Sequence, residues 1–219
     1  MDYLSSSEMA DVDRYAVEEL GIPEAKLMEL AGLRTAEIIR ENFESQKIRV
    51  FAGRGNNGGD AVSAARFLKS FGFEPIISTV GEPLKELLRE LEIADNLDIQ
   101  RKGYGDDIES ELVLDGLLGY GIKGDPRQPL AGVIREINDS DTEVVSLDVP
   151  SGLDPKSGRE MSPTVEADIN ISLAAPKHGI EDSSLENYLA FISIPEEAFR
   201  SVGREKSSQL SEKPFFRIK

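Results

Sequence analysis

The sequence predicts an α/β fold, in which a doubly wound and largely parallel sheet carries helices on both faces. Three observations support this fold class. Short apolar runs of strand length alternate with segments of helical periodicity along the chain. One apolar run leads into a glycine-rich loop at residues 53–60 that opens a helix, and two further runs each end on an aspartate in a glycine-rich turn. In such folds the ligand binds beyond the carboxyl ends of the strands.

Two helices are expected before the first strand. Ser5–Ser7 can cap a helix over about residues 8–20, and Gly21 would end it. Pro23 opens a second helix that reaches about Phe43. Its broad apolar face suits it to cover a sheet or a partner subunit.

The rest of the chain alternates strand and helix. In order, the pattern predicts a strand ending at Val50–Ala52, a helix from Gly58 or Gly59 to Phe71, a strand over 74–80, a helix over about 83–97, a short strand over 98–102, a strand over 112–114, a helix over 129–138, strands over 143–147, 167–173 and 188–194, and a last turn of helix over 195–202. The tail, residues 204–219, either stays loose or docks Phe215 and Phe216. Because no repeat or linker is visible, residues 1–219 are expected to form one domain.

The composition excludes several classes of function. The chain has no Cys and a single His, which removes thiolate sites, cysteine nucleophiles and multi-histidine metal sites. Its formal net charge of −16 argues against a nucleic-acid partner. No apolar run reaches the length of a membrane span, and residues 1–10 are polar and acidic, unlike a signal peptide. We therefore expect a cytoplasmic protein with a small-molecule partner and no membrane contact.

The loop at 53–60 satisfies the Gly-x-Gly-x-x-Gly pattern of dinucleotide-binding folds, and Glu74 lies about 20 residues on, where a ribose-binding acid is expected. That pattern alone is weak. A phosphate-binding P-loop is excluded because no Lys-Ser or Lys-Thr follows the glycines. Neither template explains Asn56, Asn57 and Asp60, which indicate a ligand that needs amide and carboxylate oxygens as well as backbone donors.

Polar side chains also follow two later strands. Asp115 opens the turn at 115–125, and Asp148 opens the turn at 148–154. If the sheet is parallel, these turns share one edge with the glycine loop, and five residues become neighbours: Asn57, Asp60, Asp115, Asp148 and Ser151. Such oxygen-only ligands suit a hard cation, and the lack of a dense carboxylate cage favours a monovalent ion over calcium.

The simpler alternative is that each aspartate is only a turn former or a helix cap. We interpret Asp154 in this way, because Asp-Pro commonly starts a turn. His178 is interpreted as a surface or core histidine with no catalytic role. Lys177 could reach a phosphate, but a solvated lysine is the commoner situation and the preferred interpretation.

Three motifs follow one another along the chain: Gly-Arg-Gly-Asn-Asn-Gly-Gly-Asp at 53–60, Asp-Gly-Leu-Leu-Gly-Tyr-Gly-Ile-Lys-Gly at 115–124, and Leu-Asp-Val-Pro-Ser-Gly-Leu-Asp at 147–154. Two shorter motifs flank them, Leu-Met-Glu-Leu-Ala-Gly at 27–32 and Ala-Pro-Lys-His-Gly at 175–179. In order and spacing, this stretch resembles the NAD(P)H-hydrate epimerases, the YjeF N-terminal domain family.

The resemblance implies a three-layer α/β/α Rossmann-like sandwich, usually a homodimer. It also implies an enzyme that interconverts the R and S hydrates of damaged NADH and NADPH. The dehydratase domain that is often fused to this family is absent at this length. Repair would then need a separate NAD(P)H-hydrate dehydratase that acts downstream on the S form.

The resemblance further implies which residues form the site. Substrate binding maps to Asn56, Asn57, Gly58, Gly59 and Asp60, to Gly119, Tyr120, Gly121, Ile122, Lys123, Gly124 and Asp125, and to Asp148, which is also the expected catalytic carboxylate. One potassium ion per subunit is implied, with ligands at Asn57, Asp115 and Ser151. Two positions depart from the family pattern. Ala61 replaces a common Gly, which would narrow the loop, and Tyr120 replaces the usual Thr, which leaves its contact open.

Two other functions stay open at this point. An NAD-dependent dehydrogenase would use the same glycine pattern, but it would leave the Asn-Asn pair and the second and third aspartate turns unexplained. A non-catalytic nucleotide- or protein-binding module of the same fold could lose Asp148 or the loop residues without harm, whereas all of them are present here.

Overall fold

Eight strands form one sheet in the structure, a computed structural model that describes residues 2–44 and 46–218. The strands are β1 Lys47–Ala52, β2 Glu74–Thr79, β3 Gln100–Arg101, β4 Leu112–Gly116, β5 Glu143–Leu147, β6 Ile169–Leu173, β7 Glu186–Ala190 and β8 Phe215–Arg217. Their order is β3-β2-β1-β4-β5-β6-β7-β8. Strands β1 to β7 pair in parallel, and only β8 among these is antiparallel. The predicted α/β fold class with a largely parallel sheet is confirmed.

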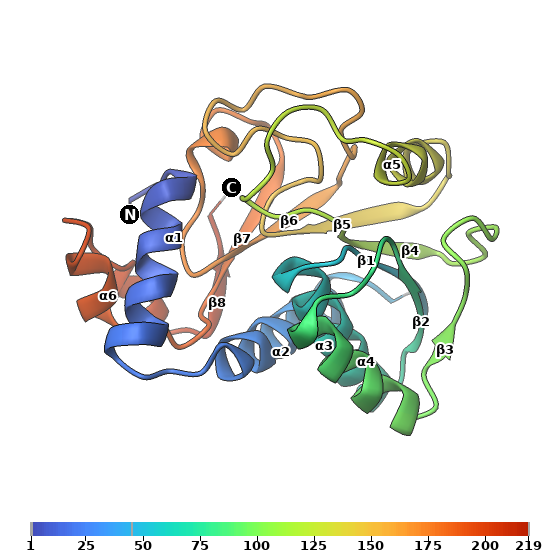
Figure 1. Ribbon diagram of the computed structural model, residues 1–219, viewed down its shortest axis with the longest axis horizontal. Helices are drawn as coiled ribbons and strands as arrows, with labels where there is room; N and C mark the ends of the chain where they lie inside the picture. Colours follow the sequence, from blue (N-terminus) through green and yellow to red (C-terminus); the bar gives the residue numbers. More distant parts are fainter. Residues whose placement is uncertain (1, 45, 219) are drawn as a thin grey trace.

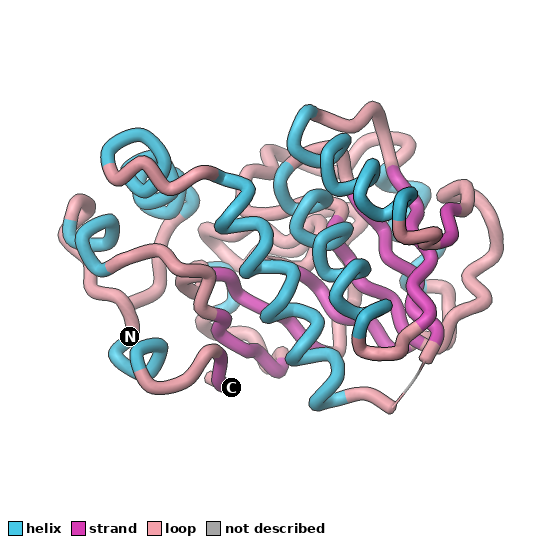
Figure 2. Tube along the Cα trace, turned by 90° about the horizontal axis from the view of Figure 1, so that it is seen from below, coloured by secondary structure: helices cyan, strands magenta, loops and turns pink. Residues whose placement is uncertain are grey.

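Helices cover both faces of this sheet. They are α1 Ser6–Arg14, the π-helix η1 Tyr15–Glu19, α2 Glu24–Asn42, α3 Asn56–Ser70, α4 Lys85–Asn96, α5 Leu130–Asn138, the 3-10 helix η2 His178–Ile180, α6 Glu196–Arg200 and the 3-10 helix η3 Ser208–Ser211. Figure 1 shows α2, α3 and α4 on one face and α5 on the other. Figure 2 looks onto the face that the three longer helices cover. The predicted three layers are therefore present.

Both faces of the central strands are buried, as expected for parallel strands between two helical layers. On β1, Ile48, Val50 and Ala52 pack into the core beneath α2 and α3. The alternate residue Phe51 packs with α5 in a second, smaller core. Because successive side chains point to opposite faces and both faces are buried, apolar residues occupy consecutive positions over 50–52.

The sheet reverses its winding direction at β1, which has β2 on one side and β4 on the other. The register places Ala52 beside Gly116, and the N–H of Gly53 donates to the carbonyl of Gly116 at 3.0 Å. The loops after β1 and β4 therefore start side by side. A Cβ on Gly53 would lie 1.8 Å from the Leu117 carbonyl oxygen, so only glycine fits there. A crevice at such a reversal is where doubly wound folds bind ligands.

The first predicted helix is divided in the structure. Its α-helical part, α1, is capped by Ser5, whose side chain accepts from the N–H of Glu8 in a capping box. The chain then forms the π-helix η1, in which the N–H of Leu20 donates to the carbonyl of Tyr15 at 3.1 Å. Periodicity does not distinguish these two helix types, because one π-turn shifts the apolar stripe by only one residue.

Other boundaries also differ from the predictions. The helix after the glycine loop starts at Asn56 rather than at Gly58 or Gly59. The strand predicted over 188–194 lies at β7, Glu186–Ala190. In the tail, the docking alternative holds, since β8 pairs with β7 and brings Phe215 beside Ala190. In the described part of the chain, no helix is both long and apolar enough to cross a membrane.

Candidate active site

A cavity of about 630 Å³ opens beyond the carboxyl ends of β1, β4 and β5. Its size falls within the usual range for small-molecule sites. Helix α1 and the start of α2 form one wall, and the start of α3 and the loop after β4 form others. Eight of the predicted site residues line it: Asn56, Asn57, Asp60, Gly119, Tyr120, Gly121, Ile122 and Asp148.

The amino end of α3 faces this cavity. Gly55 is its N-cap, and no side chain caps the first turn, so the first backbone N–H groups remain available to an anionic ligand. Gly58 and Gly59 lie behind this end. A Cβ would meet the Gly53 carbonyl oxygen at 1.9 Å in the first case and the Met28 Cε at 2.5 Å in the second. These two glycines therefore let α3 pack closely against its neighbours.

Asp115 and Ser151 lie together, fully buried, beneath the cavity. The Asp115 carboxylate accepts four hydrogen bonds, from the Ser151 N–H and hydroxyl, the Ser146 hydroxyl and the Leu117 N–H, at 2.6 to 3.1 Å. Burial raises the pKa of Asp115, and the hydrogen bonds from Ser151, Leu117 and Ser146 oppose that rise. The cluster joins the ends of β4 and β5.

Asn57 continues this cluster towards the cavity. The Ser151 hydroxyl accepts from the Leu118 N–H at 2.9 Å, and a Cβ on the next residue, Gly119, would lie 3.4 Å from the Asn57 side chain. The Asn57 Nδ2 atom is buried and has no hydrogen-bond partner among residues 2–44 and 46–218. Ser151 and Asp115 are therefore joined directly, whereas Asn57 lies beside the loop that contacts Ser151 and its amide nitrogen, a hydrogen-bond donor, lacks a partner among the described residues.

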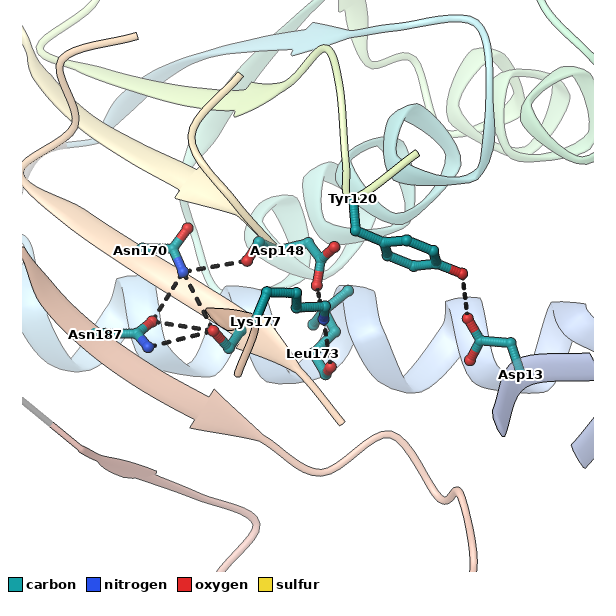
Figure 3. Close-up of polar contacts among 8 residues, drawn as sticks. Asp13, Tyr120, Asp148, Asn170, Leu173, Lys177 and Asn187 are labelled. Carbon is teal, nitrogen blue, oxygen red and sulfur yellow. Dashed lines mark hydrogen bonds and ion pairs between the residues drawn. The ribbon is translucent and has the colours of Figure 1, made fainter. Parts of the chain in front are cut away.

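Asp148 is buried at the end of β5 and adopts a left-handed backbone conformation with φ of +70°. Its carboxylate forms an ion pair with the ammonium of Lys177, which also donates to the Leu173 carbonyl at 3.1 Å (Figure 3). Lys177 is only 1% exposed and lines the cavity. The interpretation of Lys177 as a solvated lysine was wrong, because the buried carboxylate of Asp148 draws it inwards.

Asp13 on α1 reaches the same site through Tyr120. The Tyr120 hydroxyl donates to Asp13 Oδ2 at 2.6 Å, and the Tyr120 ring centre lies 5.5 Å from the Lys177 Nζ (Figure 3). Burial raises the pKa of Tyr120, and the negative charge of Asp13 raises it further. Burial also raises the pKa of Asp13 itself. Sequence reasoning missed Asp13, because it belongs to no motif and ends near the site only through the packing of α1.

Asp60 faces the cavity from α3 without a hydrogen bond to any described residue. Burial raises its pKa well above the ordinary value of 3.8, and the nearby charges of Asp148 and Asp13 raise it further. Burial and these neighbouring charges therefore favour the neutral form of the Asp60 carboxyl, which lies close to the charged pair of Asp148 and Lys177.

A buried amide network supports the turn at Asp148. Asn170 Nδ2 donates to the Asp148 carbonyl at 3.2 Å and to Asn187 Oδ1 at 2.8 Å (Figure 3). Both amides come from neighbouring strands, β6 and β7. They tie the strained backbone at Asp148 to the rigid sheet, which keeps its carboxylate in place.

The remaining predicted residues lie outside the cavity lining. Lys123, Gly124 and Asp125 belong to the same loop as Tyr120, but Asp125 Oδ1 instead accepts from the Ser162 N–H at 3.1 Å. Their assignment to substrate binding stays a prediction. His178 stacks on Tyr3 with ring centres 6.4 Å apart and does not line the cavity. Glu74 is the first residue of β2, so it lies at the amino edge of the sheet, away from the cavity.

Comparisons with known proteins agree with this geometry. The chain is 37% identical over 204 residues to the NAD(P)H-hydrate epimerase of Plasmodium knowlesi, which covers 88% of this chain and 70% of that protein. It is also 37% identical over 182 residues to the bifunctional NAD(P)H-hydrate repair enzyme Nnr of Archaeoglobus fulgidus, covering 82% of this chain but only 38% of that longer protein.

The fold matches a solved structure over its full length. The crystal structure of the yeast protein ynu0 (YNL200c) superposes with a TM-score of 0.88, covers 100% of both chains and is 23% identical in sequence. The sequence profile described as YjeF-related protein N-terminus matches residues 24–179, a span that contains the α3 amino end, the Asp115 cluster and the Asp148–Lys177 pair. The chain therefore belongs to the family of YjeF-related protein N-termini.

Proposed function

We propose that the protein is an NAD(P)H-hydrate epimerase, which interconverts the R and S forms of hydrated NADH and NADPH. The observation that carries the proposal is the ion pair of Asp148 and Lys177, which lies in the wall of a cavity at the winding reversal of the sheet. The relatives named as NAD(P)H-hydrate epimerases support the choice of substrate. The free amino end of α3 offers a place for the substrate's diphosphate.

The reaction inverts one carbon atom of the nicotinamide ring, which bears a hydroxyl and adjoins the ring nitrogen. The hydroxyl takes up a proton and leaves as water, and the lone pair of the ring nitrogen then forms an iminium bond. Water adds to the opposite face and releases a proton. We assign this proton exchange to the side chains around Asp148. No hydride moves, so the reaction needs no redox cofactor.

The potassium ion is part of the proposal. Asn57, Asp115 and Ser151 would hold it through their side-chain oxygens, and the direct hydrogen bond between Ser151 and Asp115 places two of these oxygens together. When bound, the ion would supply positive charge beside the buried Asp115 carboxylate and next to the substrate loop.

The position of Glu74 argues against the dehydrogenase alternative. A ribose-binding acid must lie at the carboxyl edge of the sheet, whereas Glu74 starts β2 at the amino edge. A binding module of the same fold would not need a charged pair buried in its cavity wall, because apolar side chains of similar volume would stabilise that wall equally well or better than Asp148 and Lys177.

The proposal includes two kinds of partner. A separate dehydratase that consumes the S hydrate would complete repair, and two copies of the chain would form a homodimer. Sedimentation velocity would test the dimer directly, since a monomer near 24.0 kDa would contradict it.

A direct assay tests the proposed function. Purified R hydrate is incubated in H₂¹⁸O with and without the protein, and the two epimers are separated by chromatography. We expect faster conversion to the S form and incorporation of ¹⁸O at the inverted carbon in the protein-dependent fraction. Conversion no faster than in buffer alone would contradict the proposal.

A further inference from the structure

Lys177 is unusual among the cationic side chains that line the cavity. Arg14 and Arg54 also line it, but both are solvent-exposed. Lys177 is 1% exposed, and its ammonium carries three protons. Asp148 accepts one of them and the Leu173 carbonyl accepts a second, at 3.1 Å. No third hydrogen-bond acceptor contacts this nitrogen within the described residues, so one N–H remains available to a ligand.

The ion pair also constrains which group can act as the acid. Asp148 accepts a hydrogen bond from the Lys177 ammonium in the resting site, so the carboxylate is the acceptor and the lysine is the donor. The Tyr120 hydroxyl donates its only hydrogen bond to Asp13. Asp60 makes no hydrogen bond to a described residue, so no neighbouring group is placed to return a proton to it. Lys177, in contrast, touches a base that can return a proton after each turnover.

We propose that Lys177 is a catalytic residue of the epimerase reaction, namely the acid that protonates the departing hydroxyl. This inference rests on the proposed function. The Lys177 ammonium gives a proton to the hydroxyl, the C–O bond breaks and water leaves, while the ring nitrogen's lone pair forms the iminium bond. Water then forms a new C–O bond on the opposite face. The proton that this water loses passes through Asp148 back to the neutral Lys177 amine. The enzyme thus returns to its starting protonation state, and one water is released for each water added.

The surroundings of Lys177 suit this task. Four titratable groups face it from four elements: Asp148 after β5, Tyr120 in the loop after β4, Asp13 on α1 and Asp60 on α3. The Tyr120 ring covers the ammonium at 5.5 Å and shields it from solvent. Because the Tyr120 hydroxyl is bound to Asp13, helix α1 holds that ring in place.

The absence of Cys from the chain allows a specific test. Lys177→Cys introduces a unique thiol, and alkylation with 2-bromoethylamine converts it to thialysine, a lysine analogue with a less basic amine. We expect Lys177→Cys to lower kcat by roughly 100-fold or more. Alkylation should restore a large part of kcat and move the alkaline limb of the pH–rate profile to lower pH. If Lys177 had only a structural role, alkylation would restore the rate without shifting the alkaline limb of the pH–rate profile.

Two controls complete the experiment. Lys156→Cys, on an exposed turn away from the cavity, should keep its rate before and after alkylation. Lys177→Arg keeps the positive charge and the partner of Asp148 but holds its proton too tightly to transfer it. It should fold, bind the hydrate and turn over at least roughly 100-fold more slowly. If Lys177→Cys does not fold, alkylation is carried out in denaturant before refolding.

Three outcomes would overturn the inference. In the first, Lys177→Arg or Lys177→Cys keeps kcat within about tenfold of the wild-type value. In the second, alkylation restores the rate of Lys177→Cys but leaves the alkaline limb of the pH–rate profile where it was. In the third, which needs no variant, the wild-type rate does not fall at alkaline pH. Failure of the wild-type protein to interconvert the hydrates would instead contradict the proposed function, so the two failures are distinguishable.

Discussion

Asp148 combines two features that rarely occur in one residue, a left-handed backbone and a buried charge. Its φ of +70° is unfavourable for most side chains, although Asp and Asn tolerate it best. The Asn170 amide anchors its carbonyl, and Lys177 neutralises its carboxylate. At this position the fold holds a strained residue in order to place one functional group.

Asp148→Asn tests the role of that group. Asn fits the same backbone conformation, so we expect the variant to fold and to bind the hydrate with a similar Kd. Epimerisation should fall by roughly 100-fold or more, because the amide cannot return a proton to Lys177. Turnover near the wild-type rate, measured by the same chromatographic assay, would remove Asp148 from the mechanism.

Asp60 gives a prediction about stability and pH. A carboxyl whose folded pKa is raised contributes stability below its unfolded value of 3.8 and loses it as pH rises through the folded pKa. Asp60→Asn should therefore raise Tm at pH 7, with little change near pH 3. The pKa of Asp154 is instead lowered, by hydrogen bonds from Ser157 and the Lys156 N–H, so its contribution to stability is present at pH 7 and is lost at low pH. Asp154→Asn should lower Tm at pH 7, and equal shifts in the two variants would contradict this account.

At the scale of elements, α1 is attached to the site by a single side-chain hydrogen bond, from Tyr120 to Asp13. The helix forms much of the cavity wall. The Tyr120 side chain therefore adds a polar link between the catalytic pair and a helix whose Met9 and Val12 are already buried in the core.

Tyr120→Phe should weaken this link while keeping the ring over Lys177. We expect a loss of about 1 kcal/mol in the free energy of unfolding, because Asp13 loses its donor. Amide hydrogen exchange should also become faster in α1. Tyr188→Phe is the matched control, since its hydroxyl donates to Asn42 at an exposed position and its loss should cost less than about 0.5 kcal/mol. Unchanged exchange in α1 would show that the bond does not hold the helix.

The glycine loop makes a prediction about its own packing. A Cβ at Gly53 would lie 1.8 Å from a backbone oxygen, whereas one at Gly55 would meet nothing within 4 Å. Gly53→Ala should therefore lower the free energy of unfolding by at least about 2 kcal/mol. Gly55→Ala should change it by only about 0.5 kcal/mol. Urea unfolding of both variants checks the difference, and equal effects would contradict the close approach of β1 and β4 loops.

At the scale of the whole molecule, the parallel sheet explains why part of the site could be predicted. Parallel strands bring all their carboxyl ends to one edge, so Asn57, Asp115 and Asp148 meet although they are far apart in sequence. Lys177 and Asp13 could not be predicted in this way. Each lies near the cavity through tertiary packing alone, and burial of a lysine depends on a partner that no local pattern reveals.

The structure of the tail could not be predicted from local sequence either. Its phenylalanines are compatible with docking, but the choice between a loose end and an antiparallel strand depends on the free edge of β7, a separate element of the sheet.

The protein has a formal net charge of −16, so a specific effect of potassium on its stability must be separated from the general effect of added salt. If potassium binds at the predicted site, Tm should rise with potassium chloride relative to choline chloride at the same ionic strength. Asn57→Ala should abolish that difference, because it removes one oxygen ligand and leaves the four hydrogen bonds of Asp115 intact. An equal rise with both salts in the wild-type protein would contradict the potassium site.

The amino-terminal segment before α1 pairs with the backbone on either side of the catalytic lysine. Leu4 bridges to Lys177, with its N–H bonded to the Pro176 carbonyl at 2.9 Å and its carbonyl accepting from the His178 N–H at 3.2 Å. A fragment trimmed to the family's matched span, 24–179, would lose this clamp and the aspartate that fastens the tyrosine. Because Leu4, Met9 and Val12 are also buried in the core, and β7 and β8 lie outside this span, such a fragment should lose folding stability as well as turnover.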